Sequence, residues 1–432
     1  MACDRADLPW LSSSGKGCGV NGPRASWLLP AIVVLAVVLR LFAVQSRVGT
    51  PLFGDEPSYD SIAQNLLAGH GYASGRPGVD LHPTAMRGPG YVLLLAASYR
   101  LFGPSALAVH LLQIILEVIS LLLIHRLARM WFAPPAVAAI AAALYAVYPP
   151  FLTGTASLLS ETFTQVTLIC TVFLFFRHIE SRQMRHLVGS ALALGICALI
   201  KPQIAPVGVI LCMAAIPRLG LARAASAAAI VVLVVTLVLS PWFVRNALVF
   251  HRFVPGLSTG GLGLWFGAGP IDGLTIGGLG DPIVPDSLRV AVARMDEMAA
   301  DRWAYAEANR LIAADPGHYA VLTLKKCFRL WFNLGFDGAP PSLATLALAA
   351  FHAFTIALAL YASRRAAPDA AGALFIGLLG AFWTVANVPF VAVVRYAFPY
   401  YALLFTFAAA GAWTLSTRFL RQRANAPRPL SE

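Results

Sequence analysis

Apolar runs of about twenty residues recur along this chain, and they constrain its fold more than any other feature. The first run, 27–45, includes Ala31-Ile-Val-Val-Leu-Ala-Val-Val-Leu39. Because a helix rises ~1.5 Å per residue and a hydrocarbon core is ~30 Å thick, about twenty such residues cross a bilayer. Nine further runs cover 105–129, 134–152, 162–178, 187–200, 203–217, 225–240, 342–362, 370–391 and 397–417. With 58% hydrophobic and 12% charged residues, the composition excludes an ordinary water-soluble fold. The sequence therefore predicts an all-α polytopic membrane protein with about ten transmembrane helices. A count as high as 11 to 13 is the alternative.

The basic residues predict the orientation of these spans. If the N-terminus is cytoplasmic, every short inner loop carries arginine, as the positive-inside rule requires. These loop residues are Arg126, Arg129, Arg177, Arg182, Arg185, Arg218, Arg223, Arg364 and Arg365. The net charge of +12 thus reflects membrane topology, and nucleic acid is not an expected partner.

We expect one transmembrane domain at 27–417 between cytoplasmic tails at 1–26 and 418–432. The first run is longer than the apolar part of a signal peptide and is interpreted as a retained anchor. The outer segments are 46–104, 153–161 and 241–341. They hold 14 of the 20 acidic residues. The predicted location is therefore the inner (plasma) membrane, multi-pass, with an extracytoplasmic active site.

Two outer stretches predict helices that do not cross the membrane. The run 91–102 is apolar but too short to span, so it predicts an interfacial helix. The stretch 287–313 has charged positions at helical spacing and predicts one amphipathic helix.

Asp55 and Glu56 are the first candidate catalytic residues, because they follow the first span within about ten residues. A carboxylate held at the membrane boundary can take a proton from a hydroxyl. Pro57 predicts an extended Glu56. The alternative is that both acids are merely solvated in a loop.

Glu161 is the third catalytic candidate and the acid of the short second outer segment. It could orient an acceptor, or bind a divalent cation (Mg²⁺ or Mn²⁺) together with Asp55. It could equally stabilise the helix that it begins, as acids do in a first helical turn. No metal or other cofactor follows with certainty from the sequence.

Four cations adjoin spans on the side that should be depleted of them. They are Arg87, Lys201, Arg245 and Arg395. A single Lys or Arg near the interface often buries only the aliphatic part of its side chain and keeps its charge in water, without binding a ligand. Four together favour an anionic ligand, and a phosphate at the membrane surface fits best.

The order of several motifs resembles the bacterial GT-C membrane glycosyltransferases, glycosyltransferase family 39-like and related to protein O-mannosyltransferases and the lipid A aminoarabinose transferase. These motifs are Gly54-Asp-Glu-Pro-Ser-Tyr59, Arg87-Gly-Pro-Gly-Tyr91, Leu159-Ser-Glu161, Pro241-Trp-Phe-Val-Arg-Asn246 and Arg395-Tyr396. The likeness extends from about residue 40 to residue 419.

The resemblance implies a GT-C-like bundle with a polyprenyl-phosphate monosaccharide donor. It implies transfer of a hexosyl or pentosyl group to a lipid, glycan or protein acceptor of the cell envelope. Attack opposite the leaving phosphate would invert the anomeric carbon. It also implies that Asp55 is the acid of the first outer loop and that Arg87 lies next to the donor phosphate. The chemistry of sugar transfer, which needs the acceptor hydroxyl deprotonated, assigns Asp55 as the general base. Aromatic residues of the motifs are predicted to contact substrate, namely Tyr59, Tyr91, Trp265 and Tyr396. In Ser258-Thr-Gly-Gly-Leu-Gly-Leu-Trp265, Thr259 and Gly263 stand where relatives have asparagine.

A transporter or flippase of lipid-linked saccharides is the alternative from another class. Such a protein would also need a cationic cavity, and the break at Lys201-Pro202 between two short apolar runs is compatible with it. The chain shows no half-to-half repeat that would favour transport. A purely structural or assembly subunit is a third reading.

Overall fold

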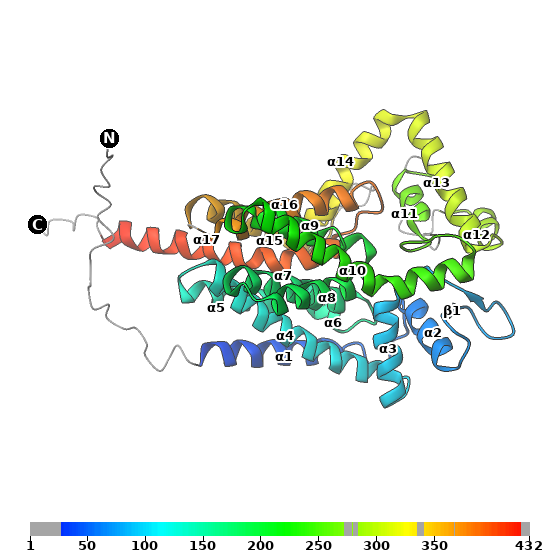
Figure 1. Ribbon diagram of the computed structural model, residues 1–432, viewed down its shortest axis with the longest axis horizontal. Coiled ribbons are helices and arrows are strands. Elements are labelled where there is room, and N and C mark those ends of the chain that lie inside the picture. The colour runs from blue at the N-terminus through cyan, green and yellow to red at the C-terminus, as the bar shows by residue number, and fades with distance from the viewer. Residues whose placement is uncertain (1–26, 272–278, 280–283, 335–340, 367, 425–432) are drawn as a thin grey trace, which may run out of the picture.

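The computed structural model describes residues 27–271, 279, 284–334, 341–366 and 368–424, and it shows a long helical bundle with a smaller group of helices at one end (Figure 1). The predicted tail 1–26 and most of 418–432 lie outside the described residues. The all-α polytopic prediction is confirmed: the described residues contain eight helices that are long and apolar enough to span a membrane, and a ninth if one bent pair is counted.

The spanning helices coincide with the predicted runs. The bent pair is α5 and α6, which meet at 54°, and a shorter apolar helix, α8, accounts for the tenth run. Their bounds are α1 Leu28–Gln45, α4 Ala106–Trp131, α5 Pro135–Val147, α6 Pro149–Thr155, α7 Glu161–Ser181, α8 Met184–Ile200, η1 Pro202–Ile204, α9 Val207–Leu219, α10 Leu221–Phe250, α15 Leu343–Arg365, α16 Ala370–Asn387 and α17 Phe398–Ala424.

The outer faces of the bundle are apolar although they are exposed. On α1, Val34 and Val38 are 61% and 54% exposed, and on α10 Leu233 and Leu237 are similarly uncovered. Apolar side chains that point away from the protein in several long helices fit contact with lipid. Only 22% of the α1 residues are buried inside the protein.

One buried ion pair joins the first helices of the bundle. Arg40 donates to a carboxylate oxygen of Glu117 at 2.8 Å, and the two side chains are 0% and 2% exposed. Tyr145 on α5 also donates to Glu117, at 3.0 Å. Because a buried charge needs partners of this kind, the pair holds α1, α4 and α5 in one arrangement.

The remaining elements gather at one end of the bundle, here called the site end. α3 runs across the bundle axis there, while α1 begins and α17 ends at the opposite end (Figure 1). These elements are α2 Glu56–Leu67, β1 Ala73–Ser74, β2 His82–Pro83, α3 Pro89–Phe102, α11 Gly260–Gly267, α12 Asp286–Ala293, α13 Glu297–Ala314, α14 Pro316–Phe332 and η2 Val394–Ala397. β1 and β2 pair antiparallel.

Two local predictions were wrong. The predicted single helix 287–313 is two helices, α12 and α13, because the Asp296 side chain accepts from the backbone N–H of Ala299 and starts a new helix. Glu56 is not extended. It is the first residue of α2, where the following Pro57 is tolerated because its missing N–H would be unpaired in a first turn.

Candidate active site

A cavity of about 310 Å³ opens at the site end, and it collects residues that are far apart in the sequence. We call it the central pocket. It lies at the small end of the range for small-molecule sites. Its lining comes from the start of α2, the turn before α3, the start of α7, the α8–η1 junction, α11 and the segment between α16 and η2.

Asp55 forms ion pairs with two arginines in this pocket. Arg87 donates to its Oδ1 at 2.7 Å and Arg395 donates to its Oδ2 at 2.6 Å. Burial by itself would raise the pKa of Asp55, but the charges and hydrogen bonds of the two guanidinium groups outweigh it and lower that pKa. Asp55 is therefore ionised at neutral pH.

Glu161 lies in the same charge cluster. Its Oε1 is 3.4 Å from Nζ of Lys201 and 3.9 Å from Nε of Arg395. Arg395 thus bridges the two carboxylates, and three cations surround two anions. Such a cluster is built to hold one further negative charge.

Local sequence explains how Asp55 and Arg87 meet. Gly54 adopts a left-handed φ of +60°, which turns the chain before α2 and places Asp55 directly in front of that helix. Asp55 makes no helix cap with its side chain, so both oxygens remain for the arginines. Arg87 is oriented by Ser58, whose Oγ accepts from Nε at 3.2 Å, and by the Tyr59 ring 5.1 Å away.

Lys201 is placed by a break in a helix. α8 ends at Ile200, and the bend at Lys201-Pro202 separates it from α9. Gly88 packs against this end so closely that a Cβ at Gly88 would overlap the backbone oxygens of Leu199 and Ile200. The α3 turn that carries Arg87 and the α8 end that carries Lys201 therefore touch backbone to backbone.

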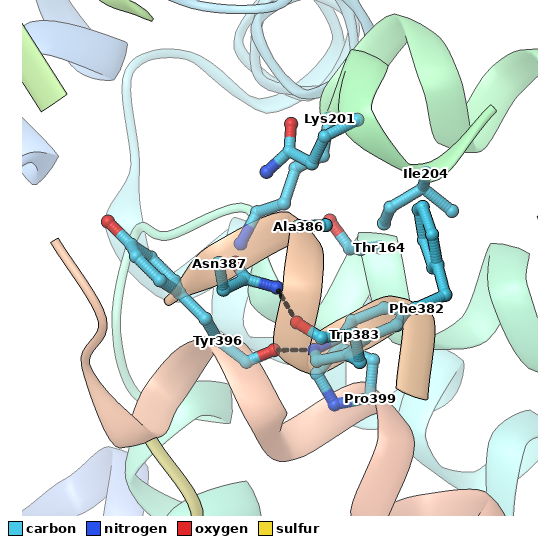
Figure 2. Close-up of a pocket in the computed structure, with 10 residues that line it drawn as sticks. Thr164, Lys201, Ile204, Phe382, Trp383, Ala386, Asn387, Tyr396 and Pro399 are labelled. Carbon is cyan, nitrogen blue, oxygen red and sulfur yellow. Dashed lines mark hydrogen bonds between the residues drawn. The ribbon is translucent and has the colours of Figure 1, made fainter. Parts of the chain in front are cut away.

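The central pocket continues into a small recess that reaches between α16 and η1 (Figure 2). The recess holds about 10 Å³, which is the space for one water-sized group. Lys201, Asn387 and Tyr396 line both spaces, and Nζ of Lys201 lies 5.4 Å from the Tyr396 ring. Figure 2 shows the Lys201 ammonium pointing toward Asn387 and Tyr396.

The structure brings most predicted site residues together. Asp55, Glu161, Arg87, Lys201, Arg395, Tyr59 and Tyr396 all line the central pocket. Sequence reasoning missed the amides Gln203 and Asn387, which line it as well. Gln203 follows Lys201-Pro202 closely, so the bend itself was a usable signal. Asn387 ends an apolar helix, and no motif marks it.

Four predicted residues do not line the central pocket. Glu56 is fully buried, where it pairs with Arg47 at 3.0 Å and accepts from the backbone N–H of Phe53 and Leu158. Tyr91 is fully buried and donates to Gln113. Their contacts are those of residues that hold the fold.

The other two lie near the end of α10 and on α11. Arg245 donates to the backbone oxygens of Thr84 and Tyr72, both at 2.8 Å. Trp265 is 2% exposed and packs against Trp303, with ring centroids 5.0 Å apart. Both therefore support the pocket walls from behind.

The carboxylates do not fit a divalent cation in this arrangement. Both oxygens of Asp55 already accept from guanidinium groups, and Glu161 faces Lys201. Three neighbouring positive charges would repel a metal ion. In the described part of the chain no three His, Cys, Asp or Glu residues cluster with metal-ligand geometry.

A second cavity of about 720 Å³ lies beside the first. Met86 lines both cavities. Glu297 lines the larger cavity and accepts from Thr84 Oγ1 and the backbone N–H of Ala85, both at 2.7 Å, and from Ser258. These hydrogen bonds join the start of α13 to the turn before α3 and to the chain just before α11.

Comparisons with known proteins support the sequence resemblance. Residues 82–244 match the family described as dolichyl-phosphate-mannose-protein mannosyltransferase. The oligosaccharyltransferase AglB from Archaeoglobus fulgidus, solved with an inhibitory peptide and a dolichol-phosphate, superposes with a TM-score of 0.55 at 14% identity. A second structure of the Archaeoglobus fulgidus enzyme, tethered to an acceptor peptide, gives 0.57 at 14% identity. The chain has the GT-C fold.

The GT-C likeness covers nearly all of this chain but only part of the archaeal protein. The AglB superposition covers 95% of this chain and 53% of that one, and the tethered structure 94% and 52%. The chain thus spans about half the length of these structures. ArnT from Cupriavidus metallidurans, solved with undecaprenyl phosphate, gives a TM-score of 0.45 at 16% identity over 94% of this chain and 82% of that one. No curated protein matches the sequence.

The matched family segment contains part of the charge cluster. Arg87, Glu161 and Lys201 lie within 82–244, whereas Asp55 and Arg395 lie outside it. The GT-C fold joins the two sets, because Arg395 reaches Asp55 across 340 positions of sequence.

Proposed function

We propose that this protein is an inverting membrane glycosyltransferase that moves one monosaccharide from a polyprenyl-phosphate donor to a hydroxyl acceptor. The proposal rests above all on Asp55, an ionised carboxylate held between Arg87 and Arg395 at one end of a membrane bundle. The dolichol-phosphate bound to AglB and the dolichyl-phosphate-mannose after which the matched family is described support a lipid phosphate as the donor class.

The arginines serve the leaving group in this proposal. A donor phosphate that enters the central pocket competes with Asp55 for Arg87 and Arg395, because phosphate oxygens accept from guanidinium as carboxylate oxygens do. Lys201 adds a third cation at the same level. Their charge stabilises the phosphate as it leaves, and this kind of electrostatic stabilisation is often the largest catalytic contribution.

Asp55 acts as the general base. Once the phosphate takes over part of the arginine hydrogen bonding, the pKa of Asp55 rises toward its ordinary value and its oxygens can face the acceptor. Asp55 removes the hydroxyl proton while the acceptor oxygen attacks the anomeric carbon. The bond from that carbon to the phosphate oxygen breaks, and its electron pair stays on the phosphate. Attack opposite the leaving group inverts the anomeric centre.

Glu161 orients the acceptor hydroxyl beside Asp55. The larger cavity behind Met86 is the approach for the acceptor, because that residue lines both cavities. Apolar surface at the site end, which includes Leu101 and Phe102 of α3 at 74% and 68% exposure, provides contact for the prenyl chain. Each buried methylene contributes ~0.8 kcal/mol to lipid binding.

The proposed placement is a multi-pass plasma membrane protein with the site end outside the cell. The basic loops at the opposite end support this orientation. The single transmembrane domain at 27–417, with cytoplasmic tails on either side, belongs to the same proposal.

The test is consumption of a labelled polyprenyl-phosphate monosaccharide by the purified protein in detergent. Arg395→Gln removes one charge-assisted bond to the phosphate, so we expect kcat/KM to fall by about 10- to 100-fold. Arg252 is an exposed arginine in the loop after α10, and Arg252→Gln is the matched control, expected to keep the wild-type rate.

Translocation without chemistry is the competing function, and the helix break at Lys201-Pro202 is the observation that favours it. In sealed vesicles a flippase would move intact labelled donor across the bilayer and leave the sugar on the lipid. Intact donor throughout, with the label crossing the membrane, would reject the transferase proposal.

A further inference from the structure

The charges of the central pocket restrict which sugar it accepts. Among the described residues that line it, five are charged: two carboxylates, Asp55 and Glu161, and three cations, Arg87, Lys201 and Arg395. Both carboxylates are already paired with cations. One positive charge is in excess.

That excess matches the proposed donor without any charge on the sugar. A prenyl phosphate sugar is a phosphodiester and carries one negative charge, so its phosphate alone balances the pocket. With the phosphate bound, the three cations balance the two carboxylates and the phosphate, so an ammonium or a carboxylate on the sugar would leave the pocket with a net charge. An unpaired charge in a partly buried site is costly.

The remaining polar groups are suited to hydroxyls. Gln203 lines both the central pocket and its recess, and its amide has no hydrogen-bond partner within the described part of the chain. Asn387, at 9% exposure, uses one N–H for the backbone oxygen of Trp383 at 2.8 Å. Its carbonyl oxygen and second N–H remain for a ligand. An amide both donates and accepts, as a sugar hydroxyl does.

We propose that the pocket selects an uncharged sugar and that Gln203 and Asn387 bind its hydroxyls. This inference rests on the proposed transferase function and specifies its donor. The recess beneath Lys201 has room for one hydroxyl-sized group, so it holds a single sugar substituent and excludes a larger one.

The experiment compares donors that share one prenyl phosphate and differ only in the sugar. The set is glucosyl, mannosyl, 2-amino-2-deoxyglucosyl and glucuronosyl, together with the prenyl phosphate without sugar. Binding is measured as ligand-dependent thermal stabilisation in detergent, and consumption is measured in parallel. We expect at least one neutral donor to bind about tenfold tighter than both charged donors.

Two matched substitutions test the residues. Gln203→Glu places a carboxylate in the pocket without removing an internal hydrogen bond, and should raise the ratio of amino-sugar to neutral-sugar binding by about tenfold. Asn387→Asp should act in the same direction. Gln45→Glu makes the same change at an exposed residue at the end of α1 and should leave the ratio unchanged.

The outcomes distinguish a wrong sugar preference from a wrong transferase proposal. If the prenyl phosphate stabilises the protein but the amino-sugar or uronic-acid donor binds as tightly as the neutral donors, selection of a neutral sugar is wrong and the lipid-phosphate site stands. An unchanged ratio in both carboxylate variants removes the two amides from sugar recognition. If neither the prenyl phosphate nor any donor stabilises the protein, both proposals fall.

Discussion

Asp55→Asn should separate catalysis from donor binding, because the same carboxylate acts as base and competes with the donor phosphate. The substitution keeps the shape of the side chain and removes its charge. Asparagine cannot take the acceptor proton, so turnover should fall. At the same time Arg87 and Arg395 lose their ionic partner, so the phosphate should bind more tightly.

The structure sets the size of both effects. Loss of a general base lowers kcat by about 10² to 10⁴. Asp55 accepts one charge-assisted bond from each arginine, at 2.7 and 2.6 Å, and such bonds contribute about 1.5–3 kcal/mol each when buried. The side chains of Asp55 and Arg395 are 29% and 35% exposed, so solvent screening reduces that contribution. A net gain of about 1.4 kcal/mol corresponds to roughly tenfold tighter binding of polyprenyl phosphate.

The assay measures initial rates with a labelled donor and, separately, polyprenyl phosphate binding by thermal shift. Asp55→Glu serves as the comparison, because it keeps the charge but moves it by one methylene. A wild-type rate in Asp55→Asn would refute the base assignment. Loss of both rate and lipid binding would show that Asp55 acts by holding the arginines in place and not by proton transfer.

Three further predictions concern stability, pH and pocket support. Arg40→Met alone strands Glu117 as an unpaired buried charge and should cost about 3–5 kcal/mol, measured by thermal unfolding in detergent, whereas the double variant with Glu117→Leu should recover most of that loss. The depressed pKa of Asp55 means that its ion pairs stabilise the protein above the ordinary carboxyl range and lose this contribution only as the pH falls below about 4. Arg87→Gln removes one of the positive charges that lower the pKa of Asp55, so the loss of stability at acid pH should begin at a higher pH. An unchanged acid side of the stability curve would contradict the ion pair between Arg87 and Asp55. Lys326 is buried, which lowers its pKa to about 8, and it donates to the backbone oxygens of Gly267 and Pro389. Lys326→Met should therefore lower the free energy of unfolding by about 1–3 kcal/mol and lower kcat. Unchanged melting temperature and turnover would show that the pocket walls do not need this residue.

The spans were predictable because their signal is local. Each apolar run reports directly on the length of one helix, so the spans can be recognised without knowledge of tertiary contacts. The structure confirms a short helix, α3, over the run 91–102, and its interfacial position stays a prediction. The break between α12 and α13 was missed because one capping carboxylate, Asp296, outweighs a continuous amphipathic pattern.

The candidate site was predictable only where charge signalled it. Asp55, Arg87 and Arg395 stand out as ions beside apolar runs. The sequence gives no sign that both arginines donate to the carboxylate of Asp55. Glu56 is adjacent to Asp55 and has the same chemistry, yet a helix turn points it into the interior toward Arg47. Only the fold distinguishes the two carboxylates. Neutral amides such as Gln203 give no signal of this kind.

The glycine contact between the α3 turn and the end of α8 has a consequence for the lipid environment. α8 is one of the shorter apolar helices, with 17 residues, so a thicker bilayer would be expected to tilt or shift it. Because Gly88 packs directly against the backbone of α8, such a shift would move Arg87 together with Lys201 and preserve the spacing of the two cations. A larger residue at this point would let bilayer thickness change that spacing, and turnover would then depend on acyl-chain length.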